Sequence, residues 1–169
     1  MQFKKIYLLI ILSVLVFSNA VFANEPKSSG KYNDWESFTV ETDAGKVCFA
    51  QTSPKKKTPP SLKRSTDSRL FVTFRPSENI KNEVSVTSGH PYKENTVVAQ
   101  SGKNKYEFFS KNNFAWLLDN KEEERFISLM KKATDIMIIA NATNGTQTTD
   151  HYSMMGFTKA YNTARKVCG

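Results

Sequence analysis

Short stretches in which apolar and polar residues alternate recur along most of the chain, with turn signals between them. Between residues 35 and 40, for example, Phe38 and Val40 alternate with polar residues. Because successive side chains of a strand point to opposite faces, this period of two is typical of a half-buried β-strand. The pattern predicts about eight short strands among nine candidate segments, which are residues 35–40, 46–52, 68–74, 83–87, 96–99, 106–109, 114–118, 135–140 and 147–153.

The spacing of apolar positions becomes helical in two later segments. Asp119 can cap a helix, and Glu122 follows it at capping-box spacing, at the start of an apolar cluster within residues 122–132. At the end of the chain, apolar residues three and four positions apart predict an amphipathic helix that runs up to Cys168. These residues are Phe157, Ala160, Tyr161, Ala164 and Val167.

Many short strands followed by two helices indicate a mainly β fold. We expect an antiparallel β-sandwich or a strongly bent sheet, with about eight short strands and the two helices near the C-terminus. The alternative is an α+β fold in which the helices pack on one face of the sheet.

Residues 1–23 have the features of a removable signal peptide. Lys4 and Lys5 precede an apolar run over residues 6–17, and residues 21–23 then offer small or modest side chains at the two positions that a signal peptidase reads. The run of about 12 residues is shorter than the roughly 20 that a membrane-spanning helix needs. We therefore expect cleavage near Ala23 and export to the periplasm, to the cell envelope or out of a bacterial cell.

The mature chain is predicted to be one domain at residues 35–169, preceded by a flexible polar leader at residues 24–34. Loss of Lys4 and Lys5 lowers the Lys and Arg count from 24 to 22 against 16 acids, which leaves a net charge of +6. This charge is moderate for the length. No nucleic-acid-binding motif accompanies it, so nucleic acid is not an expected partner.

The positive charge is concentrated at residues 55–64, where prolines and lysines predict an exposed loop. This basic loop could contact anionic lipid headgroups or an acidic partner, and its alternative role is that of a merely solvated loop. The candidate contact residues are Lys55, Lys56, Lys57, Lys63 and Arg64.

The chain has two cysteines, Cys48 and Cys168. In an oxidising compartment such a pair predicts a disulfide that closes a loop of about 120 residues. Two free thiols or a bridge between chains are the alternatives.

No specific catalytic constellation is present. The sequence lacks a G-x-S-x-G elbow, and two distant histidines with two cysteines do not supply metal-ligand spacing, so neither a metal nor a cofactor is expected. Asp150 and Glu122 are the carboxylates that a small hydrolase could use. We expect the aromatic residues to form core rather than a ligand platform. These are Phe71, Phe74, Phe108, Phe109 and Trp116.

Several motifs follow one another in a recognisable order between residues 35 and 168. They are an early strand at Trp35 that leads to Cys48, the segment at 69–76 (RLFVTFRP), residues 82–85 (NEVS), residues 115–116 (AW), a helix with Phe126 and Met130 ahead of an apolar strand, residues 145–146 (GT), the block 149–154 (TDHYSM), residues 156–160 (GFTKA) and the final Cys168. In this order the chain resembles the invasion-associated locus B family of bacterial exported proteins. The basic loop departs from the family pattern by being longer and more charged, and Met154 and Met155 replace a more usual aliphatic pair.

The resemblance implies a periplasmic or envelope-associated β-sandwich protein, linked in some pathogens with entry into host cells. It implies no defined reaction and no catalytic residues. We therefore expect a non-enzymatic protein that binds an envelope protein, a host protein or an anionic ligand, with at most peripheral membrane contact. The alternatives are a small envelope hydrolase using Asp150 and a membrane-surface module acting through residues 55–64.

Overall fold

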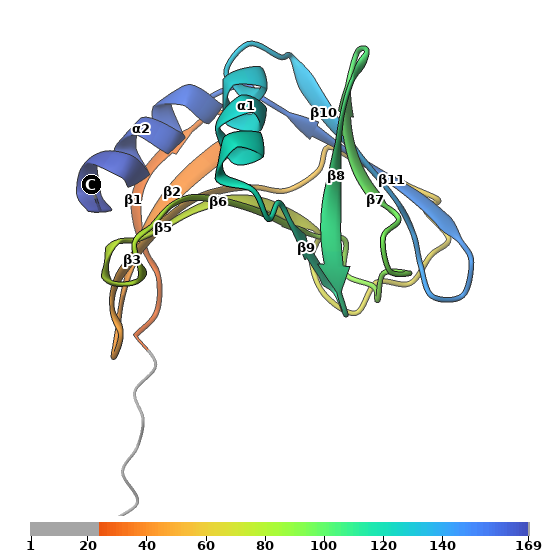
Figure 1. The fold of residues 1–169 in the computed structure, drawn as a ribbon, viewed down its shortest axis with the longest axis horizontal. Helices are drawn as coiled ribbons and strands as arrows, with labels where there is room; N and C mark the ends of the chain where they lie inside the picture. The colour runs from red at the N-terminus through yellow and green to blue at the C-terminus, as the bar shows by residue number, and fades with distance from the viewer. Residues whose placement is uncertain (1–23, 169) are drawn as a thin grey trace, which may run out of the picture.

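Residues 24–168, which the computed structural model describes, form one antiparallel sheet of eleven strands in the order β1-β2-β3-β5-β6-β9-β8-β7-β10-β11-β4 (Figure 1). Residues 1–23, where the predicted signal peptide falls, and residue 169 lie outside the described part. The strands are β1 (Lys27–Tyr32), β2 (Trp35–Thr42), β3 (Gly45–Thr52), β4 (Lys56–Thr58), β5 (Arg69–Arg75), β6 (Ile80–Thr87), β7 (Val97–Ser101), β8 (Asn104–Lys111), β9 (Phe114–Trp116), β10 (Asp135–Asn141) and β11 (Gln147–Ser153).

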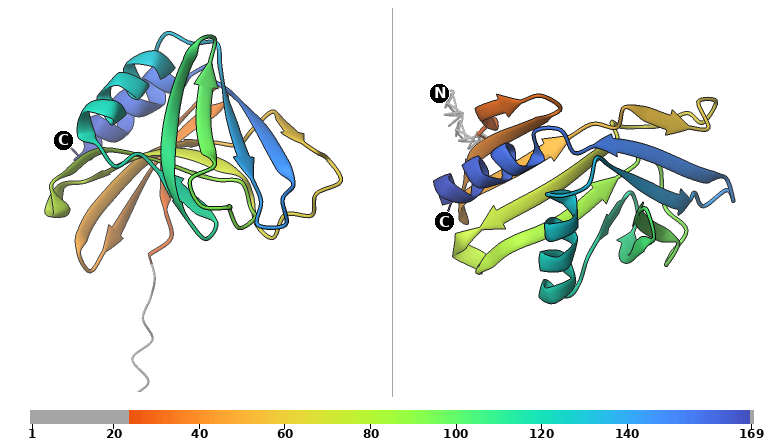
Figure 2. Two further views of the ribbon diagram at one scale, coloured as in Figure 1. Left: turned by 45° about the vertical axis from the view of Figure 1, so that its right-hand side comes forward. Right: turned by 90° about the horizontal axis from the view of Figure 1, so that it is seen from above.

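The sheet bends strongly at the short strand β9, which pairs with β6 on one side and with β8 on the other. Its two arms then enclose a shared core, as the two views in Figure 2 show. Val84 and Val86 of one arm and Phe108 and Ile138 of the other belong to the same buried cluster. The prediction of a mainly antiparallel β fold is confirmed, with more strands than the eight expected.

Helix α1 (Asn120–Met130) begins where the capping pattern predicts it. The Asp119 carboxylate accepts hydrogen bonds from the backbone N–H groups of Lys121 (2.8 Å) and Glu122 (3.0 Å), which satisfies two of the unpaired donors of the first turn. The helix buries Phe126 and Met130 against the sheet. The apolar stripe therefore fixes which face of α1 packs inward.

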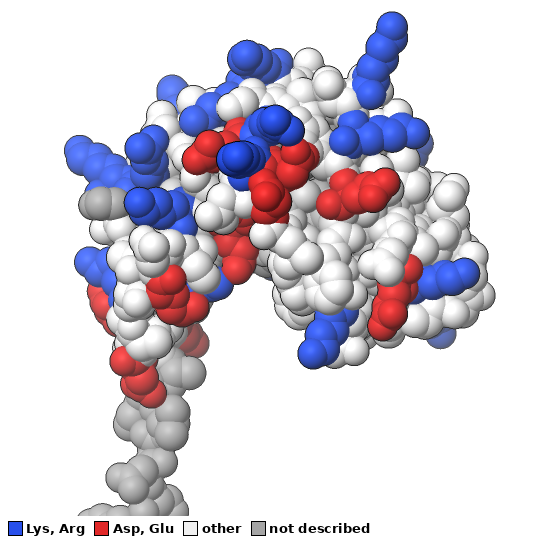
Figure 3. Space-filling view, viewed as in Figure 1, with Lys and Arg blue, Asp and Glu red and all other residues white. Residues whose placement is uncertain are grey.

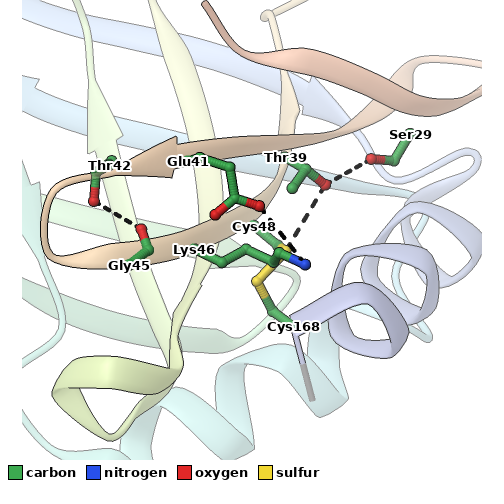
Figure 4. Close-up of a disulfide and its surroundings, with 8 residues drawn as sticks. All are labelled: Ser29, Thr39, Glu41, Thr42, Gly45, Lys46, Cys48 and Cys168. Carbon is green, nitrogen blue, oxygen red and sulfur yellow. Dashed lines mark hydrogen bonds and ion pairs between the residues drawn. A yellow bond between two sulfur atoms is a disulfide. The ribbon is translucent and has the colours of Figure 1, made fainter. Parts of the chain in front are cut away.

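Helix α2 (Phe157–Cys168) lies over β2 and β3, and the disulfide between Cys168 and Cys48 joins its last residue to β3 (Figure 4). The two Cα atoms are 5.8 Å apart, and 120 positions separate them in the sequence. Closing a loop of this length stabilises the fold by up to about 5 kcal/mol through the entropy of the unfolded chain. The predicted helix and the predicted bridge are both confirmed.

The expectation of a flexible leader over residues 24–34 is wrong, because β1 pairs with β2 at the edge of the sheet. Its sequence has no apolar alternation, so backbone pairing holds it, together with a 2.9 Å hydrogen bond between the hydroxyls of Tyr32 and Thr163. Gly156 permits the close approach of the Tyr32 backbone. A Cβ at that position would lie 1.8 Å from the Tyr32 carbonyl oxygen, and its φ is +93°.

Part of the basic loop is also ordered. β4 pairs with β11, so that Lys57 lies opposite Asp150 and Lys56 lies opposite His151. Lysines flanked by prolines do not predict a strand. The segment is extended because the edge of β11 offers backbone partners.

Candidate functional site

A cleft of about 710 Å³ lies between α1 and α2. Side chains of β5 and β6, of the turn between these strands and of both helices line it. Phe74, Ile80 and Ile127 contribute apolar surface, and Cys168 of the disulfide closes one part of its wall. The bridge and the sheet therefore hold the two helices on either side of the opening.

Three cations from three different elements line this cleft: Lys81 of β6, Lys131 at the end of α1 and Arg165 of α2. Within residues 24–168, none of the three forms an ion pair with an acid. Figure 3 shows Lys and Arg side chains gathered over α2, with a cluster of acids beside them. Glu124 of α1 also lines the cleft, so three cations face one acid there and the lining keeps a net positive charge.

Lys131 and Arg165 act on one another. Burial lowers the pKa of Lys131, and the positive charge of Arg165 lowers it further. The Lys131 ammonium lies 4.2 Å from the centre of the Tyr161 ring, which compensates part of this cost by a cation–π contact. Two like charges held near each other in a cleft form a site that an anion would stabilise.

The Tyr161 hydroxyl donates a 2.8 Å hydrogen bond to Asn82 Oδ1. Burial raises the pKa of Tyr161, so its phenol stays protonated at neutral pH. The ring also packs on Phe74 and Phe157, at centroid distances of 5.5 and 5.7 Å. The floor of the cleft is therefore rigid and largely apolar, while its charged groups lie around it.

A second pocket, of about 410 Å³, adjoins the cleft and shares residues 79–82 and Glu124 with it. Its lining is acidic and includes Glu83 and Glu123. The Glu123 side chain is packed so that the residue is only 7% exposed, and its Oε1 accepts a 3.2 Å hydrogen bond from the N–H of Val84.

The pKa of Glu123 is raised to about 7. Burial is the main cause, and the nearby charges of Glu83 and Asp119 act in the same direction, while the hydrogen bond from Val84 opposes them. A buried carboxylate that titrates near neutrality therefore lies next to the cationic cleft.

Arg64, from the basic loop, is buried at another part of the molecule. Its guanidinium forms a two-pronged ion pair with Asp150, at 2.7 Å (Nη2 to Oδ1) and 2.9 Å (Nη1 to Oδ2). The two side chains are 7% and 0% exposed, respectively, and Nη1 also donates to the Ser88 carbonyl at 2.6 Å. The expectation that Arg64 lies on the exposed basic surface is therefore wrong.

The other basic-loop residues remain at the surface. Lys55 pairs with Asp34 and thereby lowers the pKa of that carboxyl. Lys56, Lys57 and Lys63 are exposed, and none of them forms an ion pair in the described chain.

Polar side chains surround the Arg64–Asp150 pair. His90 Nε2 lies 3.1 Å from the Thr148 hydroxyl, and the Tyr92 hydroxyl donates to Ser88 at 2.9 Å. Burial lowers the pKa of His90, with a further contribution from the charge of Arg64. A neutral histidine thus helps to enclose the ion pair.

The two carboxylates considered for a hydrolase lie on different elements. Asp150 belongs to β11, and both of its carboxylate oxygens accept hydrogen bonds from Arg64. Glu122 lies on α1 and pairs with Arg125 at the surface, at 2.7 Å. Each is therefore engaged in an ion pair of its own.

The aromatic residues divide between the two faces of the sheet. Phe74 and Phe108 are in the core, as expected. Phe71, Phe109 and Trp116 are on the outer face, where Phe109 is 42% exposed and lies 5.2 Å from the Trp116 ring, so the core expectation is wrong for these three.

Sequence reasoning missed the cleft because it searched for charge density along the chain. Lys81, Lys131 and Arg165 are separated by 50 and 34 positions, and only the packing of α1 on β6 and of α2 on β2, β3 and β5 brings them together. The available signal was weak: two basic residues follow the last apolar position of α1, and two more lie in the last turn of α2.

No helix in residues 24–168 is long and apolar enough to cross a membrane. In the same residues no group of three or more His, Cys, Asp or Glu side chains is arranged to hold a metal ion. Comparison of the chain with protein-family models, with curated proteins and with solved structures finds no match.

Proposed function

We propose that this protein is an exported, non-enzymatic protein of the bacterial cell envelope that binds a small organic anion in the cleft between α1 and α2. Export is supported by the signal-like pattern of residues 1–23 and by the disulfide, which suits an oxidising compartment. The resemblance to invasion-associated locus B proteins points to the same location.

The observation that carries the proposal is the set of three cations around an apolar floor. The lining holds a single acid, Glu124, against them, and none of the three forms an ion pair within the described residues. A phosphate or carboxylate placed at the cations of this cleft would offset the repulsion between Lys131 and Arg165. Phe74 and Ile127 would meanwhile cover an apolar part of the ligand.

The helix dipole alone does not account for this arrangement. Cations are favourable near a helix C-terminus wherever they point. Lys132 and Lys166 satisfy that preference as well as Lys131 and Arg165 do, yet they do not line the cleft. They therefore provide matched controls of equal charge at the same helix ends.

The test uses hexyl phosphate, which combines an anionic group with a short apolar chain. In calorimetric titrations we expect the Lys131→Gln/Arg165→Gln variant to bind it at least tenfold more weakly than the wild type. The Lys132→Gln/Lys166→Gln variant should bind like the wild type. Absence of binding to the wild type, or equal weakening in both variants, would overturn the proposal.

Exposed Lys56, Lys57 and Lys63 favour a second candidate function, peripheral contact with an anionic membrane surface. Sedimentation with vesicles rich in anionic lipid tests it. The triple Lys→Gln variant should lose binding that the wild type shows at low salt, whereas vesicles that fail to retain the wild type even at low salt would reject the idea.

A further inference from the structure

The cationic cleft and the acidic pocket beside it have opposite charge and a common wall. Residues 79–82 and Glu124 line both. On one side of this wall lie Lys131 and Arg165, and on the other lie Glu83 and Glu123. A ligand that extends across the wall would meet positive charge at one end and negative charge at the other.

Glu123 is the buried acid in this pocket with acceptor capacity to spare, whereas Glu124, which also lines the pocket, is exposed. Within the described residues, its Oε1 accepts from Val84, and no side chain or backbone group donates to its Oε2. Glu83 is already held by Arg75, at 2.7 and 3.1 Å. The Asp119 carboxylate is engaged by the first turn of α1.

Other charged groups also act at this pocket. Lys81 of β6 and Glu124 of α1 line it together with Glu83. Acids therefore outnumber cations around Glu123, and this balance favours a positively charged guest over a negative one. Glu123 is 93% buried by its packing, so a cation that reaches it would be largely shielded from water.

We propose that the cleft and the acidic pocket form one composite site for a zwitterionic ligand, whose anionic group lies at Lys131 and Arg165 and whose primary amine donates to Glu123. This inference rests on the proposed function, since it assigns a second group to the ligand of the same cleft. It specifies an amine and an anion joined by a short spacer.

Binding of the amine would change the protonation of Glu123. Because the pKa of this carboxyl is raised to about 7, a large part of it is protonated at neutral pH in the unliganded protein. An ammonium group against the carboxylate lowers that pKa, and the proton passes to the buffer. The amine should therefore add proton release to the binding reaction.

The experiment compares 6-aminohexyl phosphate with hexyl phosphate, which differ only by the amine. We expect the aminoalkyl compound to bind the wild type at least tenfold more tightly. This preference should disappear in Glu123→Gln and persist in Glu122→Gln, a change one residue away in an exposed side chain that does not line the pocket. Pairs of alkyl and aminoalkyl phosphates with butyl and octyl chains vary the length of the spacer.

Two further measurements on the wild type do not depend on the folding of a variant. Calorimetry in buffers of different ionisation enthalpy should show more proton release with the aminoalkyl phosphate than with the alkyl phosphate. The ratio of the two affinities should also fall as the pH drops from 8 to 5, because Glu123 becomes protonated.

The outcomes separate this inference from the proposed function. If hexyl phosphate binds in the manner described above but the amine adds no affinity at any spacer length, the proposal of a zwitterionic ligand is overturned, while the proposed anion site stands. If the amine adds affinity equally in the wild type and Glu123→Gln, the assignment of Glu123 is overturned. If neither compound binds, both proposals fail.

Discussion

Arg64 and Arg165 belong to the same residue type, yet the fold treats them in opposite ways. Arg64 is buried, and both ends of its guanidinium are matched by the oxygens of Asp150. Arg165 lines a cleft together with Lys131 and one acid, Glu124, and no acid in the described chain forms an ion pair with it. A charge that is paired and enclosed serves the fold, whereas unpaired charges gathered at a cleft are available to a ligand.

The difference lies in what surrounds each charge. Around Arg64, the Ser88 carbonyl and the Ser68 hydroxyl accept further hydrogen bonds, so its donors are met within the protein. Around Lys131, the Tyr161 ring offers only a cation–π contact. The comparison can be tested by removing charge from each region and measuring stability and binding separately.

The largest effect is expected from Asp150→Asn. It leaves a buried guanidinium without its counter-charge, which costs about 3–5 kcal/mol of the free energy of unfolding. Denaturant unfolding at neutral pH measures it. Asp67→Asn, in the exposed pair with Arg69, is the control and should cost less than about 1 kcal/mol.

If Asp150→Asn and Asp67→Asn prove equally mild, the buried pair does not hold the fold and the contrast with the cleft disappears. The double variant Arg64→Met/Asp150→Leu sharpens the result. It removes both charges and should recover part of the loss, because no buried charge is left unpaired, although the Ser88 carbonyl and the Ser68 hydroxyl lose the donor that Arg64 provides.

An intermediate effect is expected from Glu123→Gln, and it depends on pH. The folded-state pKa of about 7 lies above the ordinary value of 4.5, so the folded protein holds the proton more tightly than the unfolded chain. Stability from this group is therefore lost as the pH rises from about 4.5 through 7, by at most about 3 kcal/mol.

Glu123→Gln removes that loss and can still accept the hydrogen bond from Val84. We expect the variant to be more stable than the wild type at pH 8 and similar to it at pH 5 in thermal unfolding. Glu122→Gln should follow the wild-type curve. A Glu123→Gln variant that is less stable than the wild type at pH 8 would contradict the assignment of a buried, destabilised carboxylate.

The smallest effect on stability is expected from Lys131→Gln and Arg165→Gln. Each removes a cation that no acid in the described chain pairs with, and relief of their repulsion offsets the loss of the contact with Tyr161. The free energy of unfolding, measured by thermal unfolding, should change by no more than about 0.5 kcal/mol. A loss as large as that of Asp150→Asn would show that these cations are structural.

The alternation of apolar residues predicted most strands correctly, because a strand buried on one face must alternate. It failed for β1 and β4, whose polar sequences carry no such signal and which are ordered by backbone pairing at the two edges of the sheet. The alternation also does not distinguish the buried face of a strand from its outer face when both carry aromatic residues. Trp116 and Phe109 thus lie on the solvent side although their aromatic character suggested core.

The local features of this protein follow from its amino-acid sequence: the positions of most strands, the cap at Asp119, the amphipathic α2 and the one possible bridge between Cys48 and Cys168. These depend on neighbours along the chain or on the number of cysteines. Which charges are paired depends instead on how the folded elements pack. Arg64 meets Asp150 across 86 positions, and the cleft cations meet across three elements, because strand order and helix packing bring distant segments together.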